Sequence, residues 1–525
     1  MRRFLTMLAG ACAIAGLSLT FATDQASAMC GCMVGRTPPP ASPTEQGALL
    51  NKATVVVMLR DGTRTVLSFQ NDYFGPAEDF ALVVPVPVVL HEGDVRTLDR
   101  GVFDRVQAVA APHMVELFEQ PPCPIARPSM RAMGGGMTSG GGAGDTGGAL
   151  AEAAPPPPVV VEAQFSEGEY DITVLGANDS SALEQWLTSH GYHLPRDAER
   201  YLRPYVQEGM KFFVARVDVD RLRAVAQRRQ AQLSRNAGWM NDGGLGQLIE
   251  GPPVDRAGDA SLGRFLSPLR IQYESERFAL PVRLGLLNSM GEQDLVVHIL
   301  SPEGRFELAN YGNRWVPTNV HVNGRAAQSF GRFYDAFFGT LSGRAPRRVW
   351  TEYAGPVTAP APCVGCDRPT LAQQDLNALG EEVVHPSGAS RLEGYTLTRL
   401  HYRYGANGLP NDLVFRPAPP MAGGIEDATM ARLGRGARRS NRNEFRVRFI
   451  AQHRWTGPMS CSSPRRNVWG GRPWTGSYAA SQDTPWPADR AIPLGAWVRD
   501  PVRELGVRRG AGGAQKSDAG MLKSR

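Results

Sequence analysis

The sequence lacks the short motifs that mark the common enzyme classes. It contains no G-x-S-x-G nucleophile elbow, no H-E-x-x-H zinc motif, no phosphate-binding P-loop and no EF-hand loop. Beyond residue 28 it has no apolar run near the roughly 20 residues that a membrane-spanning helix requires. Its net charge of +6 in 525 residues is small for a protein that binds nucleic acid. We therefore expect no nucleic-acid partner, no cofactor and no transmembrane helix after the first 28 residues.

The first 28 residues have the pattern of an export signal. Arg2 and Arg3 precede an apolar stretch at residues 4–21, and residues 26–28 read Ala-Ser-Ala, which is typical of a signal-peptidase site. The mature chain is therefore expected to start at Met29, in a secreted or periplasmic location. A lipid anchor on Cys12 is the alternative, but the apolar stretch before Cys12 is very short.

Six cysteines follow the predicted cleavage site, an even number that suits a disulfide framework in an oxidising compartment. The disulfide candidates are Cys30, Cys32, Cys123, Cys363, Cys366 and Cys461. A ring closed between Cys30 and Cys32 would be strained, whereas Cys363 and Cys366 can close across two intervening residues. Parity then pairs Cys30 and Cys32 with Cys123 and Cys461.

The same cysteines allow two other interpretations. Cys363 and Cys366 could form a redox pair, but the prolines on both sides do not place the first thiol at a helix start, as a thioredoxin-like site requires. Together with Cys30 and Cys32 they could bind zinc, although Cys-x-Cys is poor spacing for such a site. A structural disulfide is the favoured interpretation, and no metal is expected.

Apolar periodicity predicts an α+β fold, rich in antiparallel sheet, with a few helices and structural disulfides. Residues 54–69 are expected to form a hairpin with a type I′ turn at Asp61 and Gly62. Apolar residues at helical spacing predict a helix from Leu98 to Val109 that ends before Pro112. Further strands are expected at residues 269–273, 278–287, 295–300, 395–404 and 445–453.

Composition divides the chain into seven segments. Glycine and proline runs between residues 134 and 158 cannot bury enough apolar surface to fold, and they indicate a linker. The segments are a signal peptide at 1–28, a strand-led unit at 29–123, a flexible Gly/Pro-rich linker at 124–163, a central α+β unit at 164–355, a Pro/Cys connector with a helix at 356–390, a C-terminal strand unit at 391–470, and a largely irregular basic tail at 471–525.

Few acidic residues are candidates for catalysis. Glu352, beside Tyr353, is the one to test first, although a polar residue at the end of a sheet is the favoured interpretation. Asp218 and Asp220 share one face of an expected strand, as paired catalytic carboxylates do. A solvated strand end and a helix N-cap at Asp220 explain that pair more simply.

Histidines and arginines supply the remaining candidates. His190 and His193 lie around an expected helix end at Gly191, and we interpret them as partners of the last helix carbonyls rather than of a metal. A basic run between residues 432 and 448 could contact a polyanion such as envelope lipid phosphate, although a solvated charged loop is favoured. The arginines proposed for that contact are Arg435, Arg438, Arg439 and Arg442.

Several segments resemble a known bacterial family of secreted proteins. They read GPAEDF at 75–80, VVPVP at 83–87, YVQEGM at 205–210, TEYAGP at 351–356 and LTRLHYRY at 397–404. This set, spread over most of residues 30–460, is similar to the domain of unknown function 2330. The resemblance implies secretion and one extended module. The family brings no assigned catalytic residue, so the resemblance implies no activity.

The sequence as a whole predicts a non-catalytic binding or envelope-structural protein with an unidentified envelope or extracellular partner. A secreted enzyme with dispersed acidic residues and an extracytoplasmic thiol oxidoreductase are the alternatives. Polar residues from distant segments that meet in one deep pocket would favour an enzyme. An exposed apolar patch or a basic face would favour binding.

Overall fold

The computed structural model describes a large part of the chain, and several predictions fall outside that part. The apolar stretch of the signal, the Gly/Pro-rich runs, Cys30, the Cys363 and Cys366 pair, and the last 27 residues are not among the described residues. Among the described residues, no helix is both long and apolar enough to span a bilayer. The described ranges are 26–27, 31–35, 50–74, 80–123, 159–194, 197–237, 266–288, 291–358, 370–385, 392–424, 434–470 and 494–498.

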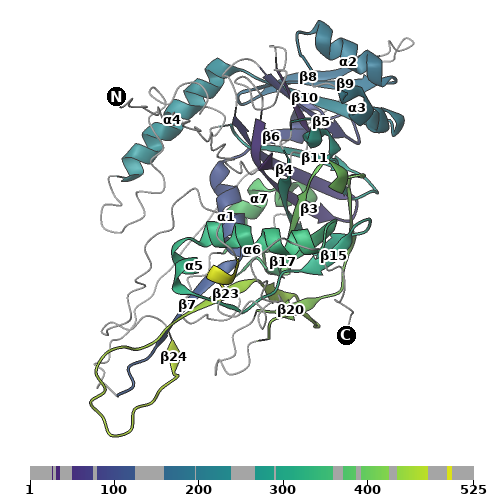
Figure 1. The fold of residues 1–525 in the computed structure, drawn as a ribbon. Helices are drawn as coiled ribbons and strands as arrows, with labels where there is room; N and C mark the ends of the chain where they lie inside the picture. Colours follow the sequence, from purple (N-terminus) through teal and green to yellow (C-terminus); the bar gives the residue numbers. More distant parts are fainter. Residues whose placement is uncertain are drawn as a thin grey trace, which may run out of the picture.

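A 12-stranded sheet forms the centre of the molecule (Figure 1). Its strands follow the order β21 (Arg438–Arg439), β20 (Met421–Gly423), β22 (Glu444–Arg446), β17 (Arg348–Pro356), β18 (Thr396–Tyr404), β13 (Gln293–Ser301), β3 (Leu50–Asp61), β4 (Arg64–Phe74), β11 (Leu269–Glu274) and β6 (Val95–Thr97). Two short strands join this path, with β1 (Ala26–Ser27) on β13 and β15 (Gly312–Trp315) on β17. Strands from the first, central and C-terminal segments of the chain therefore share one sheet.

Three smaller sheets surround the central one. The five-stranded sheet has the order β2 (Cys32–Gly35), β5 (Phe80–Val86), β10 (Lys211–Val217), β9 (Tyr170–Ala177) and β8 (Val159–Glu167). A three-stranded sheet contains β12 (Ala279–Leu280), β19 (Leu413–Pro417) and β14 (Phe306–Leu308). A four-stranded sheet contains β16 (Val320–Val322), β23 (Arg448–His453), β7 (His113–Glu119) and β24 (Trp469–Gly470).

Helices cover the outer faces of the sheets. The α-helices are α1 (Arg100–Ala110), α2 (Ser180–Ser189), α3 (Ala198–Gln207), α4 (Val219–Ala237), α5 (Gly324–Gln328), α6 (Phe330–Arg344), α7 (Gln373–Ala378) and α8 (Glu381–Val384). Short 3-10 helices lie at η1 (Glu92–Asp94), η4 (Arg283–Asn288), η5 (Leu392–Gly394), η6 (Ala406–Gly408) and η7 (Leu494–Ala496).

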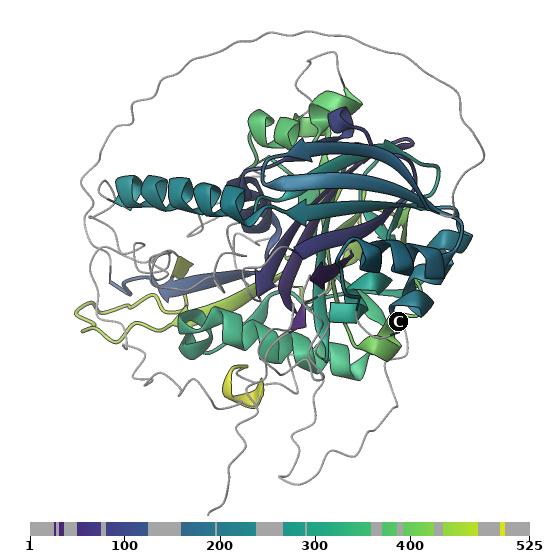
Figure 2. The ribbon, with the colours of Figure 1, turned by 90° about the horizontal axis from the view of Figure 1, so that it is seen from above.

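Apolar side chains arrange these elements in four layers. Alternate residues of β3, β4 and β13 pack against alternate residues of β5, β9 and β10, so the two largest sheets lie face to face. The opposite face of the five-stranded sheet is covered by α2 and α3 (Figure 2). The opposite face of the central sheet is covered by α1 and α7 in one cluster and by α6 in another. The central sheet is therefore buried on both faces, and polar side chains within it need partners there.

The structure is sheet-rich and fits the α+β class, but the central and four-stranded sheets are mixed, while the five-stranded and three-stranded sheets are antiparallel. Parallel pairs join β13 to β3, β15 to β17, β20 to β22, and β23 to both β7 and β16. Parallel neighbours need long crossover connections, and these pairs unite segments that are distant in the sequence. Local alternation of apolar residues predicts a strand but not which partner the strand chooses.

The predicted hairpin at residues 54–69 is confirmed as β3 and β4, but the turn is not type I′. Asp61 pairs with Arg64, which leaves Gly62 and Thr63 as the central residues. Only Gly62 has a positive φ, at +54°, whereas a type I′ turn needs positive φ at both central residues. Helix α1 forms as predicted, with the Asp99 side chain accepting from the Gly101 N–H at its start.

Two other local predictions are wrong. Residues 278–287 form only the short strand β12, because Pro281 cannot donate to a ladder and the chain continues into η4. The Asp412 carboxylate accepts from Val282 N at 2.8 Å and fixes that change of direction. At the start of α4, Asp218 rather than Asp220 is the cap, accepting from the backbone N–H groups of Asp220 and Arg221 at 3.0 and 2.9 Å.

The disulfide prediction also needs correction. Cys123 is bonded to Cys461, with Cα atoms 5.7 Å apart, so neither takes Cys30 or Cys32. Parallel pairing of β7 with β23 places Phe118 opposite His453, which brings the chain after each strand to the same place. Cys32 is a free thiol within β2, and burial raises its pKa to about 12. That thiol is protonated at neutral pH and is a packing residue.

Candidate functional site

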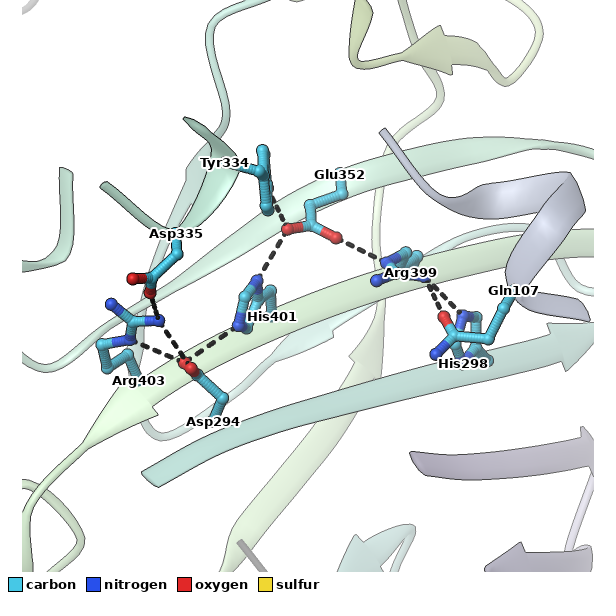
Figure 3. A network of polar contacts seen from close by, with 9 residues as sticks. All are labelled: Gln107, Asp294, His298, Tyr334, Asp335, Glu352, Arg399, His401 and Arg403. Carbon is cyan, nitrogen blue, oxygen red and sulfur yellow. Dashed lines mark hydrogen bonds and ion pairs between the residues drawn. The ribbon is translucent and has the colours of Figure 1, made fainter. Parts of the chain in front are cut away.

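Charged side chains follow one face of β18, in the middle of the central sheet. Arg399, His401 and Arg403 alternate with Leu400 and Tyr402, so the charged residues point to one face and the apolar residues to the other. The apolar residues join the core between the two large sheets. The charged residues face the side that α1 and α6 cover (Figure 3).

The neighbouring strand β13 supplies partners for these charges. Its antiparallel register places Asp294 opposite Arg403 and His298 opposite Arg399. Arg403 donates to both oxygens of Asp294, at 2.8 and 2.6 Å, in the two-pronged geometry that suits an arginine–carboxylate pair. Arg399 contacts His298 Nε2 at 3.3 Å. Cross-strand pairing therefore determines which charges meet.

Glu352 enters the network from the other neighbour, β17. It lies in the middle of that strand and is fully buried, not at the end of a sheet. The register of β17 with β18 shifts between Thr351 and Tyr353, so Glu352 occupies a β-bulge. A bulge turns its side chain relative to the regular alternation, and here the carboxylate meets β18.

Both oxygens of Glu352 have partners within the protein. Oε2 accepts from Arg399 Nε, while Oε1 contacts His401 Nδ1 at 2.7 Å and accepts from the Tyr334 hydroxyl on α6. The other ring nitrogen of His401 contacts Asp294 Oδ1 at 3.1 Å. The imidazole thus bridges two carboxylates, which orients the ring through both of its nitrogens.

Helix α6 covers this bridge with aromatic rings. Phe338 stacks on the His401 ring at a centroid distance of 3.6 Å and an interplanar angle of 3°. The Arg403 guanidinium lies 5.5 Å from the centroid of the same Phe338 ring. The same Phe338 ring therefore covers both cationic groups, and a cation near a ring face is stabilised by the ring quadrupole.

The network becomes more exposed towards one end. Glu352 is fully buried, the side chains of Arg403 and Asp294 are 12% and 21% exposed, and Asp335 is 43% exposed. Arg403 donates to Asp335 on α6 at 2.8 Å. Solvent therefore reaches the network at Asp335, while the Glu352 end is dry.

The opposite end is closed by α1. Arg399 donates from Nη1 to the side-chain oxygen of Gln107, a residue of that helix. His298 is fully buried beside Arg399, and burial followed by the positive charge of Arg399 lowers the pKa of His298 well below 6.5. His298 is therefore neutral, which lets its Nε2 accept from the arginine.

Opposite charges outweigh burial at the centre of the network. Burial by itself raises the pKa of Glu352, but Arg399 and His401 lower it to about 2. Burial also opposes charging of His401, yet Glu352 and Asp294 raise its pKa above 6.5. The network holds the carboxylates Asp294, Asp335 and Glu352 and the cations Arg399, Arg403 and protonated His401. These charges sum to zero.

The charged groups of this arrangement are paired with one another, whereas the buried His298 Nδ1 has no hydrogen-bond partner among the described residues. The small apolar cavity between the two large sheets is lined by residues including Phe69, Phe80 and Tyr170, and none of the network residues lines it. Among the described residues, no three His, Cys, Asp or Glu side chains are placed to hold a metal. The distant polar residues therefore do meet, but they do not meet at this cavity.

The structure separates the other acidic and histidine candidates from this network. Asp218 and Asp220 are bound by arginines on α4, with Asp218 held by Arg221 at 3.0 Å and Asp220 by Arg223 at 2.9 Å. His190 ends α2, and its Nδ1 contacts the Trp186 carbonyl at 2.8 Å, as interpreted from the sequence. These residues belong to helix ends.

The basic run divides into buried and exposed arginines. Arg448 is buried and donates to Asn319 Oδ1 at 3.0 Å, and Arg446 lies 5.3 Å from the Tyr353 ring centroid. The exposed members include Arg438 and Arg439 of β21 and Arg442. Arg432 lies outside the described residues.

Sequence reasoning identified Glu352 but missed its partners. The LTRLHYRY segment alternates charged and apolar residues over the whole of β18, which is the pattern of a strand with one polar face. Because the central sheet is covered on both faces, that polar face had to be buried with partners. The alternation in this segment was therefore a usable sequence signal for the buried polar face. No sequence pattern marked Asp294, His298 or Tyr334 as its partners.

Comparison with known protein families gives a match over most of the chain. A family described as an uncharacterized protein conserved in bacteria, DUF2330, matches residues 24–232 and 254–416. The match includes β13, α6, β17 and β18, the strands and helix that build most of the network. No curated protein matches the chain. No solved structure matches it either.

Proposed function

The chain belongs to the DUF2330 family of bacterial proteins, and we propose that it is an exported, non-catalytic protein that binds an envelope component through its surface. The observation that supports this proposal most is the mutual pairing of the charged groups in the polar network around Glu352. Its charged groups bind one another inside a covered sheet, and none of them lines the apolar cavity between the two large sheets. A catalytic site instead needs groups that contact a substrate.

The best-supported binding surface is the edge of the central sheet at β21. Among the described strands β21 pairs with β20 alone, and it carries the exposed Arg438 and Arg439. Neither guanidinium forms an ion pair with a described residue, and Arg442 meets Glu444 only at 3.4 Å with 75% of its side chain exposed. We call Arg438, Arg439 and Arg442 the basic edge.

An exposed aromatic residue lies against the same loop. Trp315 is 45% exposed at the end of β15, and a Cβ built on Gly436 would lie 3.7 Å from its Nε1. A tryptophan beside unpaired arginines suits an anionic ligand that also has an apolar or ring surface. Charges on an edge strand also prevent strand-to-strand aggregation, which requires no ligand.

Binding of long-chain polyphosphate distinguishes a ligand-binding role of the basic edge from a role in preventing aggregation. We expect the affinity of the protein for this probe to fall strongly as the salt concentration rises. The triple variant Arg438→Ser, Arg439→Ser, Arg442→Ser should bind at least tenfold more weakly, because each arginine near an anionic surface contributes about 1 kcal/mol. The matched control is Arg203→Ser, Arg277→Ser, Arg416→Ser, which removes the same charge from exposed arginines that are paired with glutamates.

Two outcomes would contradict the proposal. If both triple variants bind equally, net charge alone explains the binding. If the basic-edge variant binds normally but aggregates, the arginines protect the sheet edge.

The enzyme alternative would be favoured by a catalytic activity that is lost in Tyr334→Phe, because that variant removes one hydroxyl and retains the ion pairs of the network.

A further inference from the structure

An arm extends from the body of the protein and ends in an acid-free tip. The arm consists of β7, β23, β24 and the residues between β23 and β24, and Figure 1 shows its loop at the far end from α2 and α3. Residues 454–470, which we call the tip, contain three arginines and no aspartate or glutamate. The tip is therefore locally basic.

The tip is held in one conformation by bonds to the end of β7. Glu119 is fully buried and accepts from the backbone N–H groups of Trp455 and Asn467 at 3.0 and 2.8 Å, and from Arg466 Nε at 2.8 Å. The disulfide between Cys461 of the tip and Cys123, which follows β7, also fixes the tip to the end of that strand. A loop fixed in this way presents its side chains with little loss of conformational entropy on binding.

The fixed loop exposes apolar and cationic side chains together. Met459 and Val468 are 52% and 47% exposed, and they are two of the four large apolar side chains exposed in the described structure. Met459 lies beside Arg466, whose Nη1 is 3.6 Å from the Met459 sulfur. Arg454 and Arg465 are exposed, and their guanidinium groups form no ion pair with a described residue. Of the carboxylates of β7 near the tip, Glu119 is bound by Arg466 and Glu116 contacts His453 Nε2 at 2.8 Å.

We propose that the tip docks on an anionic phospholipid surface. Unpaired arginines are attracted to lipid phosphates, and adjacent apolar side chains gain free energy when they enter the boundary between headgroups and acyl chains. A projecting loop reaches such a surface without a rearrangement of the body. This docking surface is separate from the basic edge, so it goes beyond the function proposed above.

Vesicle co-sedimentation of the full chain tests the proposal. The two preparations are vesicles of phosphatidylcholine with an equal part of phosphatidylglycerol, and vesicles of phosphatidylcholine alone. We expect binding to the first and little to the second. Arg454→Ser with Arg465→Ser should weaken binding about 25-fold, because each arginine near an anionic surface contributes about 1 kcal/mol, or about fivefold. Met459→Ser with Val468→Ser should weaken binding by at least tenfold.

Matched variants away from the tip serve as controls. Val161→Ser removes an equally exposed apolar side chain from β8, and Arg203→Ser with Arg277→Ser removes the same charge elsewhere. Both should bind like the unmodified protein, and circular dichroism should show that all variants are folded. The proposal is overturned if the unmodified protein does not bind anionic vesicles, or if the tip variants bind them normally. It is also overturned if only the basic-edge variant loses binding, a result that would instead support the basic edge as the contact.

Discussion

Glu352 in the central sheet and Glu119 in the arm are both fully buried glutamates paired with an arginine. The same kind of ion pair has different structural consequences at the two places. Both have a pKa lowered to about 2, and both are bound by an arginine. Glu352 also binds side chains from β18 and α6, whereas Glu119 also binds two backbone N–H groups of the tip. The first glutamate joins strands and a helix, and the second shapes a loop.

The difference follows from what each carboxylate connects. Removal of Glu352 would leave Arg399 without its counter-charge and His401 with Asp294 as its one remaining carboxylate, between packed layers where both side chains are buried. Removal of Glu119 would leave backbone donors and Arg466 near the surface, where water replaces the lost bonds. We therefore expect global effects at the first site and local effects at the second.

The largest effect should come from Glu352→Gln. This variant leaves a buried guanidinium without its counter-charge and should lower the free energy of unfolding by about 3–5 kcal/mol. Urea denaturation measures the loss, with Glu274→Gln as a control because Glu274 is 67% exposed in its pair with Arg64. The control should cost less than about 1 kcal/mol. Equal losses in the two variants would show that the network does not stabilise the sheet.

Loss of the disulfide should have the next largest effect. Cys123→Ser with Cys461→Ser opens a link across 338 residues and should cost about 2–4 kcal/mol. Hydrogen exchange should become faster in residues 454–469 by a larger factor than in β13 and β18, where it reports only the global loss. An increase as large in the central sheet as in the tip would contradict the division between arm and body.

Glu119→Gln should cost less, about 1–3 kcal/mol, through the weakened bonds to Arg466 and to the backbone of the tip. Faster hydrogen exchange should again be confined to residues 454–469. A loss as large as that of Glu352→Gln would show that the arm and the body unfold as one unit.

The smallest effect should be a pH dependence that comes from His401. Its folded-state pKa is raised above 6.5, so its contribution is fully present below that value and is lost as pH rises through the folded-state pKa. Glu352 has the opposite sign, because its lowered pKa adds stability above about 4.5 that is lost as pH falls towards about 2. Urea midpoints of the unmodified protein should decline on the alkaline side of about pH 6.5, and His401→Gln should remove that part of the decline.

The sequence by itself determined most of the local elements. Alternation of apolar residues located β3, β4, β11, β13 and β18, and helical spacing located α1, because these patterns depend only on which residues must face a core. Family membership was also recognisable from short segments. Glu352 could be singled out because it lies beside Tyr353 in the TEYAGP segment, one of the segments that resemble the family.

The tertiary structure alone decided which segments became neighbours. The parallel pairing of β7 with β23 joined residues more than 300 positions apart, and with it the partner of Cys123 changed from the predicted one to Cys461. The pairing of β18 with β13 and β17 likewise brought His401 between Asp294 and Glu352. A strand's sequence specifies its two faces, but its edges are backbone N–H and C=O groups that are the same for every strand. Which strands become neighbours therefore depends on the packing of the whole molecule. The assembly of the polar network around Glu352 depended on the same packing.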